Sequence, residues 1–174
     1  MTHEQAMYYK YLLICGFTEE LNNYIDTALN RENPISDIVL NLSSCRSDNK
    51  KTLMYLNEFI STANEEQIDY NEVFNLIHNF LRNKYTLEKA TVEKITDLMY
   101  KISVLSEKEA DNPWWTMNIL GDLYAEAKDG YIDMQRYMEN FNSFINDGIC
   151  MESSILQEPK PSFFKRLFKK ANNK

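Results

Sequence analysis

The sequence predicts an all-α protein of about eight helices, arranged as stacked antiparallel hairpins in a compact bundle or a short solenoid, with no sheet. Apolar residues recur at the i, i+3, i+4, i+7 spacing of a helix along almost the whole chain. The 174 residues include only four glycines and four prolines, which are few turn formers for a β-rich fold. The polar breaks are mostly short, so consecutive helices are expected to be antiparallel neighbours. No fixed repeat period is apparent, and we expect one domain over residues 1–148.

The first two predicted helices lie on either side of Gly16. The first covers residues 2–15 and opens with Thr2 and Gln5, which have the spacing of a capping box. Gly16 is suited to end it, and Thr18 is the expected N-cap of the second helix. The tyrosines of MYYKY point to different sides of the first helix, so at least one is expected outside the core. The two apolar stripes are Ala6, Met7, Leu13 and Ile14, then Leu21, Tyr24, Ile25, Ala28 and Leu29.

Two further helices are predicted between Pro34 and Ala63. Asn33–Pro34 is expected to interrupt the second helix and start the third, because proline suits a first helical position. Ser47 or Asp48 is expected to start the fourth helix after a polar corner. Their stripes are Ile35, Ile38, Val39, Leu42 and Cys45, then Leu53, Leu56, Phe59, Ile60 and Ala63.

The fifth and sixth predicted helices follow the acidic stretch NEEQIDYNE. Within it, Asp69 and Glu72 have the spacing of an N-cap and its N3 partner. The sixth helix, from Thr86 to Ser106, is the longest that the pattern predicts. The two stripes are Val73, Leu76, Ile77, Phe80 and Leu81, then Val92, Ile95, Leu98, Met99, Ile102 and Leu105.

The last two predicted helices follow the polar break SEKEADNP. Pro113 fits the first position of the seventh helix, with Asn112 as its cap. Asp129–Gly130 and Asp147–Gly148 are the expected ends of the seventh and eighth helices. Their stripes are Trp114, Met117, Leu120, Leu123, Tyr124 and Ala127, then Met134, Tyr137, Met138, Phe141 and Ile145.

Charge is distributed unevenly along the chain. Residues 1–160 hold all 26 acidic residues and 14 of the 19 basic ones, a formal charge of −12, whereas PSFFKRLFKKANNK has five basic residues and no acid. An acidic body argues against nucleic-acid binding, which needs clustered Lys and Arg to neutralise phosphates. It is compatible with a basic protein partner. The alternative is that the charge only keeps the protein in solution.

We expect a cytoplasmic protein. No run of about eighteen apolar residues occurs, and MTHEQAMYYK lacks the basic segment and apolar core of a secretory signal. Cys15, Cys45 and Cys150 are odd in number, far apart and set in or beside apolar patterns. That usage favours reduced, structural thiols.

The sequence is poor in catalytic and metal-binding groups. Its two histidines are His3, near a helix start that is expected to fray, and His78, beside the fifth apolar stripe. It has no H-E-x-x-H, C-x-x-C or G-x-S-x-G motif and no glycine-rich phosphate loop. No glutamate is followed three residues later by histidine, as in helical di-metal sites. We expect a non-enzymatic protein with no metal and no cofactor.

The segment SEKEADNPWW and the helix after it form the predicted partner-binding surface. Adjacent tryptophans on a helix point about 100° apart, so one can join the core while the other stays partly exposed. Tryptophan is enriched at binding hot spots, and the neighbouring acids suit a basic partner. The alternative is that both indoles pack inside and the acids are only a polar loop. The candidate residues are Glu107, Glu109, Asp111, Trp114, Trp115, Asp122, Glu126 and Asp129.

The end of the sequence is predicted to be a linker, residues 149–161, followed by a short basic amphipathic helix, residues 162–174. Aromatic and aliphatic residues group on one side of that helix and basic residues on the other. Three interpretations remain open: docking on the acidic surface of the same or a neighbouring molecule, a disordered solubilising end, and weak contact with a membrane surface. The candidate contact residues are Phe163, Phe164, Lys165, Arg166, Leu167, Phe168, Lys169 and Lys170.

Two segments resemble the small, acidic, all-helical immunity proteins that bacteria encode beside polymorphic toxins. They are NPISDIVLNLSSCRSDNKKTLMYLNEF and DNPWWTMNILGDLY. The resemblance implies a non-enzymatic protein that binds one cognate toxin tightly and blocks it. The basic tail does not map onto such a family. It keeps open an alternative function, a helical scaffold or a membrane-peripheral adaptor.

Overall fold

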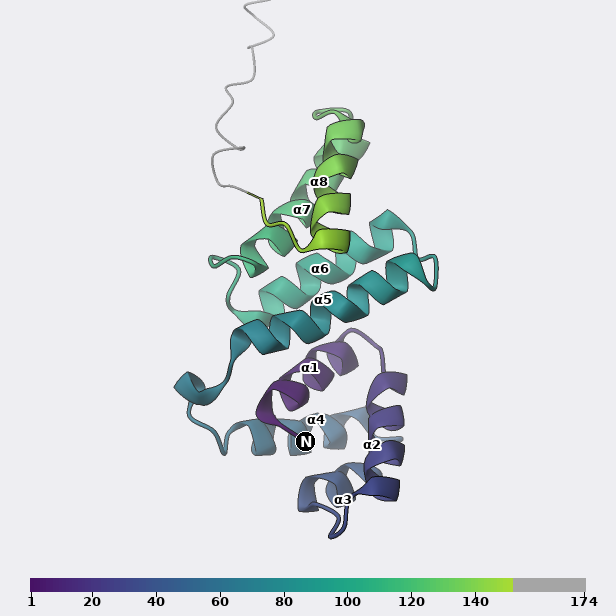
Figure 1. Ribbon diagram of the computed structural model, residues 1–174, viewed down its shortest axis with the longest axis vertical. Helices are drawn as coiled ribbons and strands as arrows, with labels where there is room; N and C mark the ends of the chain where they lie inside the picture. The colour runs from purple at the N-terminus through teal and green to yellow at the C-terminus, as the bar shows by residue number, and fades with distance from the viewer. Residues whose placement is uncertain (152–174) are drawn as a thin grey trace, which may run out of the picture.

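The computed structural model describes residues 1–151, which form eight α-helices and one 3-10 helix and contain no strand (Figure 1). The all-α prediction, with about eight helices, is therefore confirmed. Residues 152–174, including the predicted tail, lie outside the described residues. Within the described part, no helix is both long enough and apolar enough to cross a membrane. The elements are α1 His3–Ile14, α2 Glu19–Arg31, α3 Asp37–Ser43, α4 Asn49–Ile60, η1 Glu65–Gln67, α5 Tyr70–Thr86, α6 Val92–Ser106, α7 Trp114–Lys128 and α8 Met134–Asp147.

Side-chain caps start several helices at the predicted residues. Thr2 and Gln5 form the capping box of α1, each side chain accepting a hydrogen bond from the other residue's backbone N–H. Asp48 caps α4 and Asp69 caps α5, each through a carboxylate that accepts a hydrogen bond from a backbone N–H of the first turn. Each cap satisfies backbone donors that a helix start leaves without an internal partner, so these boundaries are set locally.

Three predicted helix starts are wrong. Pro34 does not begin α3, which starts at Asp37 after Ser36 has donated from both its N–H and its hydroxyl to Glu32 Oε2 (3.0 and 2.7 Å). Thr86 ends α5, and α6 begins only at Val92, after Thr91 as N-cap. Helix α7 begins at Trp114, one residue later than predicted, and Pro113 takes the N-cap position that was expected for Asn112. The segment TLEKA contains good helix formers, so its composition did not reveal the break between α5 and α6.

Helix α1 lies between two hydrophobic cores (Figure 1). Its Ala6 and Leu13 belong to one core, together with residues of α2, α3 and α4. Its Tyr11 and Leu12 belong to the other core, together with residues of helices α5, α6, α7 and α8. The first helix therefore needs apolar residues on opposite faces, and its single predicted stripe was incomplete. Ile14, placed in that stripe, is 44% exposed, while Tyr11 is buried.

The second core sets the position of α7. Helices α6 and α7 approach closely at Gly121, where an added Cβ would lie 2.8 Å from Tyr100 Cβ. Helix α8 packs against both α5 and α7. The chain then returns to the first turn of α7, where Met151 is 4% exposed and its N–H donates to Thr116 Oγ1 (3.1 Å). Residues 149–151, assigned to the linker from sequence, thus end the described chain beside α7.

Candidate functional site

Lys108 brings two acidic loops together. Its Nζ lies 3.1 Å from Glu65 Oε1, across 43 residues of sequence, and 4.5 Å from the ring centroid of Tyr70. Its backbone N–H donates to Ser106 Oγ (3.1 Å), which fixes the start of the α6–α7 loop. The hydrogen bond to Glu65 raises the pKa of Lys108. The loop after α6 is therefore held against η1 and the first turn of α5.

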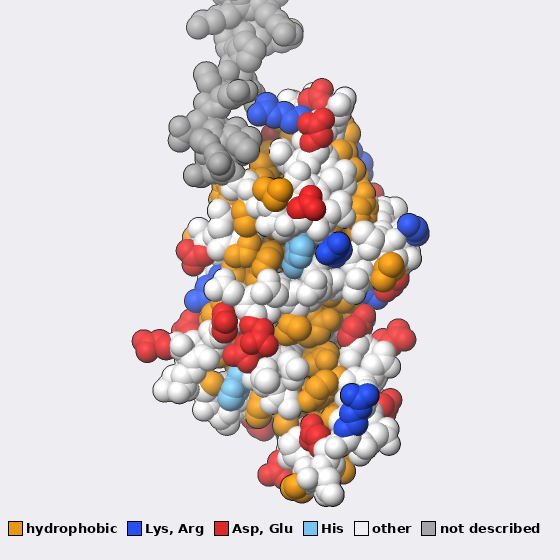
Figure 2. All heavy atoms as spheres, viewed as in Figure 1, with side chains coloured by type: hydrophobic (Ala, Val, Ile, Leu, Met, Phe, Trp, Pro, Cys, Tyr) orange, Lys and Arg blue, Asp and Glu red, His pale blue; other side chains and the backbone are white. Residues whose placement is uncertain are grey.

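The result is a surface that we call the acidic ridge. The N-terminus of α1 adds Glu4, whose Oε1 accepts a hydrogen bond from the Asp69 N–H (3.2 Å). Partial burial raises the pKa of Glu4, but hydrogen bonds from backbone groups and from Thr2 outweigh it and leave that pKa below its ordinary value. Figure 2 shows acidic side chains gathered where α5 starts, beside the N-terminal end of α1. We define the ridge as the acidic residues of the three segments that these contacts join: Glu4, then Glu65, Glu66, Asp69 and Glu72, then Glu107, Glu109 and Asp111.

The two tryptophans occupy different environments. Trp114 is 2% exposed and meets the Phe74 ring edge-on, with 5.5 Å between centroids. Trp115 is half-buried and packs on the rim of the same core. Its backbone N–H donates to the Asp111 carbonyl (2.8 Å), which ties it to the end of the acidic loop. Trp115 is thus the indole that a partner can touch, while Trp114 is a core residue.

The remaining candidates lie along the outward side of α7. At 100° per residue, Trp115, Ile119, Asp122, Glu126 and Asp129 fall within an arc of about 80°. We call these five residues the α7 stripe. Its acids are exposed and its two apolar members are half-buried. The stripe runs about 21 Å along the helix axis.

The structure therefore distributes seven of the eight predicted residues over two joined surfaces. Glu107, Glu109 and Asp111 belong to the acidic ridge, and Trp115 stands where the ridge meets the α7 stripe. Asp122 and Glu126 lie further along the stripe, and Asp129, at its far end, is not close to the ridge. Trp114 contributes to neither surface.

Sequence reasoning missed the ridge residues outside the α6–α7 loop. The run NEEQIDYNE was visible as an acidic break, but nothing in it indicates that it meets SEKEAD. Tyr70 and Lys108, which hold the loops together, carry no local signal of that role. Their pairing depends on how α5 and α6 pack.

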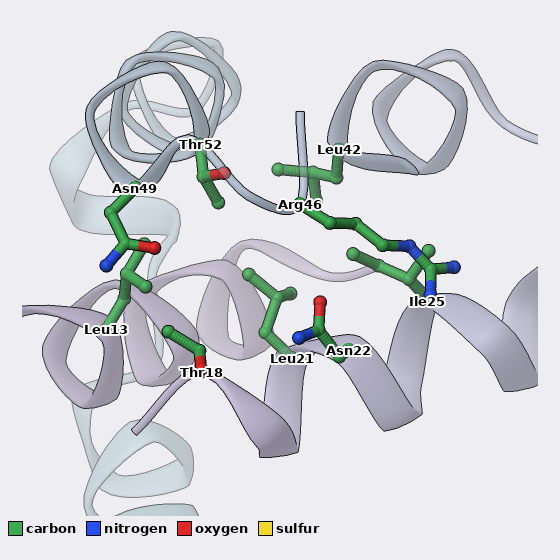
Figure 3. Close-up of a pocket in the computed structure, with 9 residues that line it drawn as sticks. All are labelled: Leu13, Thr18, Leu21, Asn22, Ile25, Leu42, Arg46, Asn49 and Thr52. Carbon is green, nitrogen blue, oxygen red and sulfur yellow. The ribbon is translucent and has the colours of Figure 1, made fainter. Parts of the chain in front are cut away.

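Two hollows and one small cavity also lie in the described structure, and the first hollow is lined in part by Asp122 of the α7 stripe. One hollow of about 390 Å³ lies between α6 and α7, and another of about 360 Å³ lies between Cys15, Ala90 and Lys101. The small cavity, between α1, α2, α4 and the α3–α4 corner, has a volume of about 10 Å³, at the lower limit of the space that one water molecule needs (Figure 3). Figure 3 shows Arg46 extending past Leu42 towards Ile25.

Both histidines make structural contacts. His3 stacks on Phe59, with 4.7 Å between ring centroids, and its Nε2 lies 3.0 Å from Thr62 Oγ1, so its side chain packs this helix start against the end of α4. His78 Nε2 lies 2.8 Å from the Phe144 carbonyl oxygen and links α5 to α8. Residues 1–151 contain no group of three or more His, Cys, Asp or Glu side chains that could hold a metal ion.

Comparison of the chain with protein-family models, with curated proteins and with solved structures finds no match.

Proposed function

We propose that this protein is a non-enzymatic immunity protein, which binds a basic toxin domain in the bacterial cytoplasm and blocks it. The observation that carries the proposal is the convergence of two acidic loops beside the half-buried Trp115. Lys108 joins these loops through Glu65 and Tyr70. The resemblance to immunity proteins supplies the class of partner.

Charge and rigidity both suit tight binding of a basic protein. Complementary charge raises association rates and fixes orientation, chiefly at low ionic strength. Trp115 offers a large, partly desolvated contact at the junction of the two surfaces. Because Lys108 already holds the loop, less conformational entropy is lost when a partner binds.

The first experiment asks whether a cognate toxin exists. The toxin encoded by a neighbouring gene is co-expressed with this protein, and growth protection and co-purification are measured. Protection together with a stable complex supports the proposal. The proposal would be refuted if no basic toxin domain encoded in the neighbourhood were bound by this protein and none were neutralised by it.

The second experiment locates the interface on the complex. Glu107→Gln/Glu109→Gln removes two ridge charges, and Glu19→Gln/Asp37→Asn removes two exposed charges on α2 and α3 as a matched control. The ridge variant is expected to slow association about tenfold at low salt and to flatten its salt dependence. The control is expected to change both quantities much less. Equal effects of the two variants would exclude the ridge as the binding surface.

A scaffold or membrane-peripheral adaptor is the second candidate, favoured by PSFFKRLFKK with its separate apolar and basic sides. These residues lie outside the described part of the chain. Flotation with anionic liposomes, with and without residues 161–174, tests it. Equal flotation of the two proteins would end this candidate.

A further inference from the structure

We propose that residues 162–174 of this chain dock on the α7 stripe of the same molecule and compete there with its partner. The competition rests on the proposed function, whereas the docking itself does not. The occupant is one named segment of the chain. Its position in the chain, its charge and the geometry of α7 support the assignment.

The α7 stripe is an unpartnered helix face. Helix α7 buries its other side against α6 and α8 through Met117, Leu120 and Ala127. Within residues 1–151, no basic side chain lies within 4 Å of the carboxylates of Asp122, Glu126 or Asp129. Three exposed acids therefore follow a half-buried Trp115 and Ile119 along one helix face.

The described chain ends beside the first turn of α7, at the end of the helix where this face begins. Met151 is buried, and its N–H donates to Thr116 Oγ1 (3.1 Å), one residue after Trp115. Figure 1 shows the last described residues running beside α7. Residues 152–161 span at most about 36 Å when extended, and the α7 stripe is about 21 Å long. Every point of the stripe is therefore within reach of residue 162.

The segment and the face complement each other chemically. The segment carries five basic residues and no acid, together with Phe163, Phe164, Leu167 and Phe168. As a helix, its thirteen residues would extend about 20 Å, close to the length of the stripe. Its apolar side suits Trp115 and Ile119, and its basic side suits the three carboxylates.

Tethering makes even a weak contact effective. A linker of this length gives an effective concentration on the order of 1 mM. A segment whose Kd in trans is about 1 mM would therefore be docked in about half of the molecules. Removing it would then raise the affinity for a partner that needs the same face about twofold, and tighter docking would give a larger factor.

The test uses backbone NMR spectra of the full chain. Substitutions in the tail leave the amino-acid sequence of residues 1–151 unchanged, so the amide signals of α7 can be compared directly between variants. The full chain is compared with a tail variant, Lys165→Glu/Arg166→Glu/Lys169→Glu/Lys170→Glu, at low salt. Amide shift differences are expected along residues 115–129, and 0.5 M NaCl is expected to reduce them. Asp122→Asn/Glu126→Gln should reduce them too, whereas Glu19→Gln/Asp37→Asn should not.

Several results would overturn the docking proposal. The first two are the absence of shift differences and shift differences centred on the acidic ridge instead of α7. The third is shift differences that grow with protein concentration, because these would indicate docking on a second copy. The fourth is shift differences that appear only when anionic vesicles are added. Failure of the proposed function leaves a different signature. In that case no basic toxin binds, yet the shifts along α7 persist. If docking alone fails, the toxin still binds and tail removal leaves its affinity unchanged.

Discussion

Replacing Lys84 with methionine should reveal an interaction that joins the two halves of the fold. Lys84, on α5, is 16% exposed, and its Nζ lies 3.2 Å from Glu20 Oε1 on α2 and 2.8 Å from Glu88 Oε1. The same ammonium lies 5.2 Å from the ring centroids of Phe17 and Phe80. Methionine keeps the apolar stem and removes the charge.

The expected loss is about 2 kcal/mol in the free energy of unfolding. Fully exposed ion pairs contribute about 0–1 kcal/mol, and breaking a fully buried pair costs about 3–5 kcal/mol. The Lys84–Glu20 pair lies between these limits, because Glu20 is 24% exposed and its Oε2 is buried without a hydrogen-bond partner among the described residues. A loss of this size lowers Tm by about 4–8 °C in a chain of this length.

The assay is urea unfolding followed by circular dichroism, with two comparison variants. Lys128→Met removes an exposed pair with Glu93 and should cost less than about 1 kcal/mol. Adding Glu20→Gln to Lys84→Met should recover part of the loss, because no largely buried carboxylate is then left without its partner; Glu88, which also loses its partner, is 58% exposed. The reasoning fails if Lys84→Met costs no more than Lys128→Met, or if Glu20→Gln adds a further full loss.

The pH dependence of the difference follows from the pKa of Lys84. Burial lowers that pKa, but hydrogen bonds to Glu88 and Glu20 outweigh burial and leave it above its ordinary value. A raised pKa in the folded state means that the stabilisation is complete below the unfolded pKa, about 10.4, and is lost as pH rises through the folded value. The gap between the wild type and Lys84→Met should stay constant from about pH 7 to 9 and narrow above about pH 10.5.

Three further predictions concern the core and alkaline pH. Trp114→Ala should cost about 3–5 kcal/mol in urea unfolding, whereas Trp115→Ala should cost about 1–2 kcal/mol, because only the first indole is fully enclosed; equal losses would contradict this placement. Gly121→Ala should destabilise by about 1–3 kcal/mol, despite alanine's better helix propensity, because its Cβ meets Tyr100 Cβ. Tyr100→Ala, which keeps that Cβ, should not rescue it, and a rescue would show that the ring is the obstacle. Burial raises the pKa of Tyr9 to about 12, so its stabilisation is complete below the unfolded pKa of about 10 and lost as pH rises towards 12; Tyr9→Phe should unfold at higher pH in an alkaline titration, and an unchanged midpoint would contradict this.

The sequence by itself determined the features that depend on neighbours within about one helical turn. Asp48 and Asp69 start their helices where predicted, because a carboxylate two or three residues before a free N–H caps it whatever the rest of the fold does. Apolar spacing gave the helix class and most of each buried face in the same way. Apolar spacing could not locate the break between Thr86 and Val92, because the segment between the two helices is polar and contains good helix formers, yet is not helical.

Only the tertiary structure decided what lies beside what. Both apolar faces of α1 are buried because a separate core lies on each side of that helix. The acidic ridge exists because Lys108 reaches Glu65 and Tyr70 after α5 and α6 have packed. Local periodicity can be seen in the sequence itself. A contact between residues 43 positions apart, such as Lys108 and Glu65, forms only after burial of apolar surface has fixed how the helices between them pack. For that reason the sequence predicted acidic and aromatic groups for binding, and the fold determined that they form a ridge and a helix face meeting at Trp115.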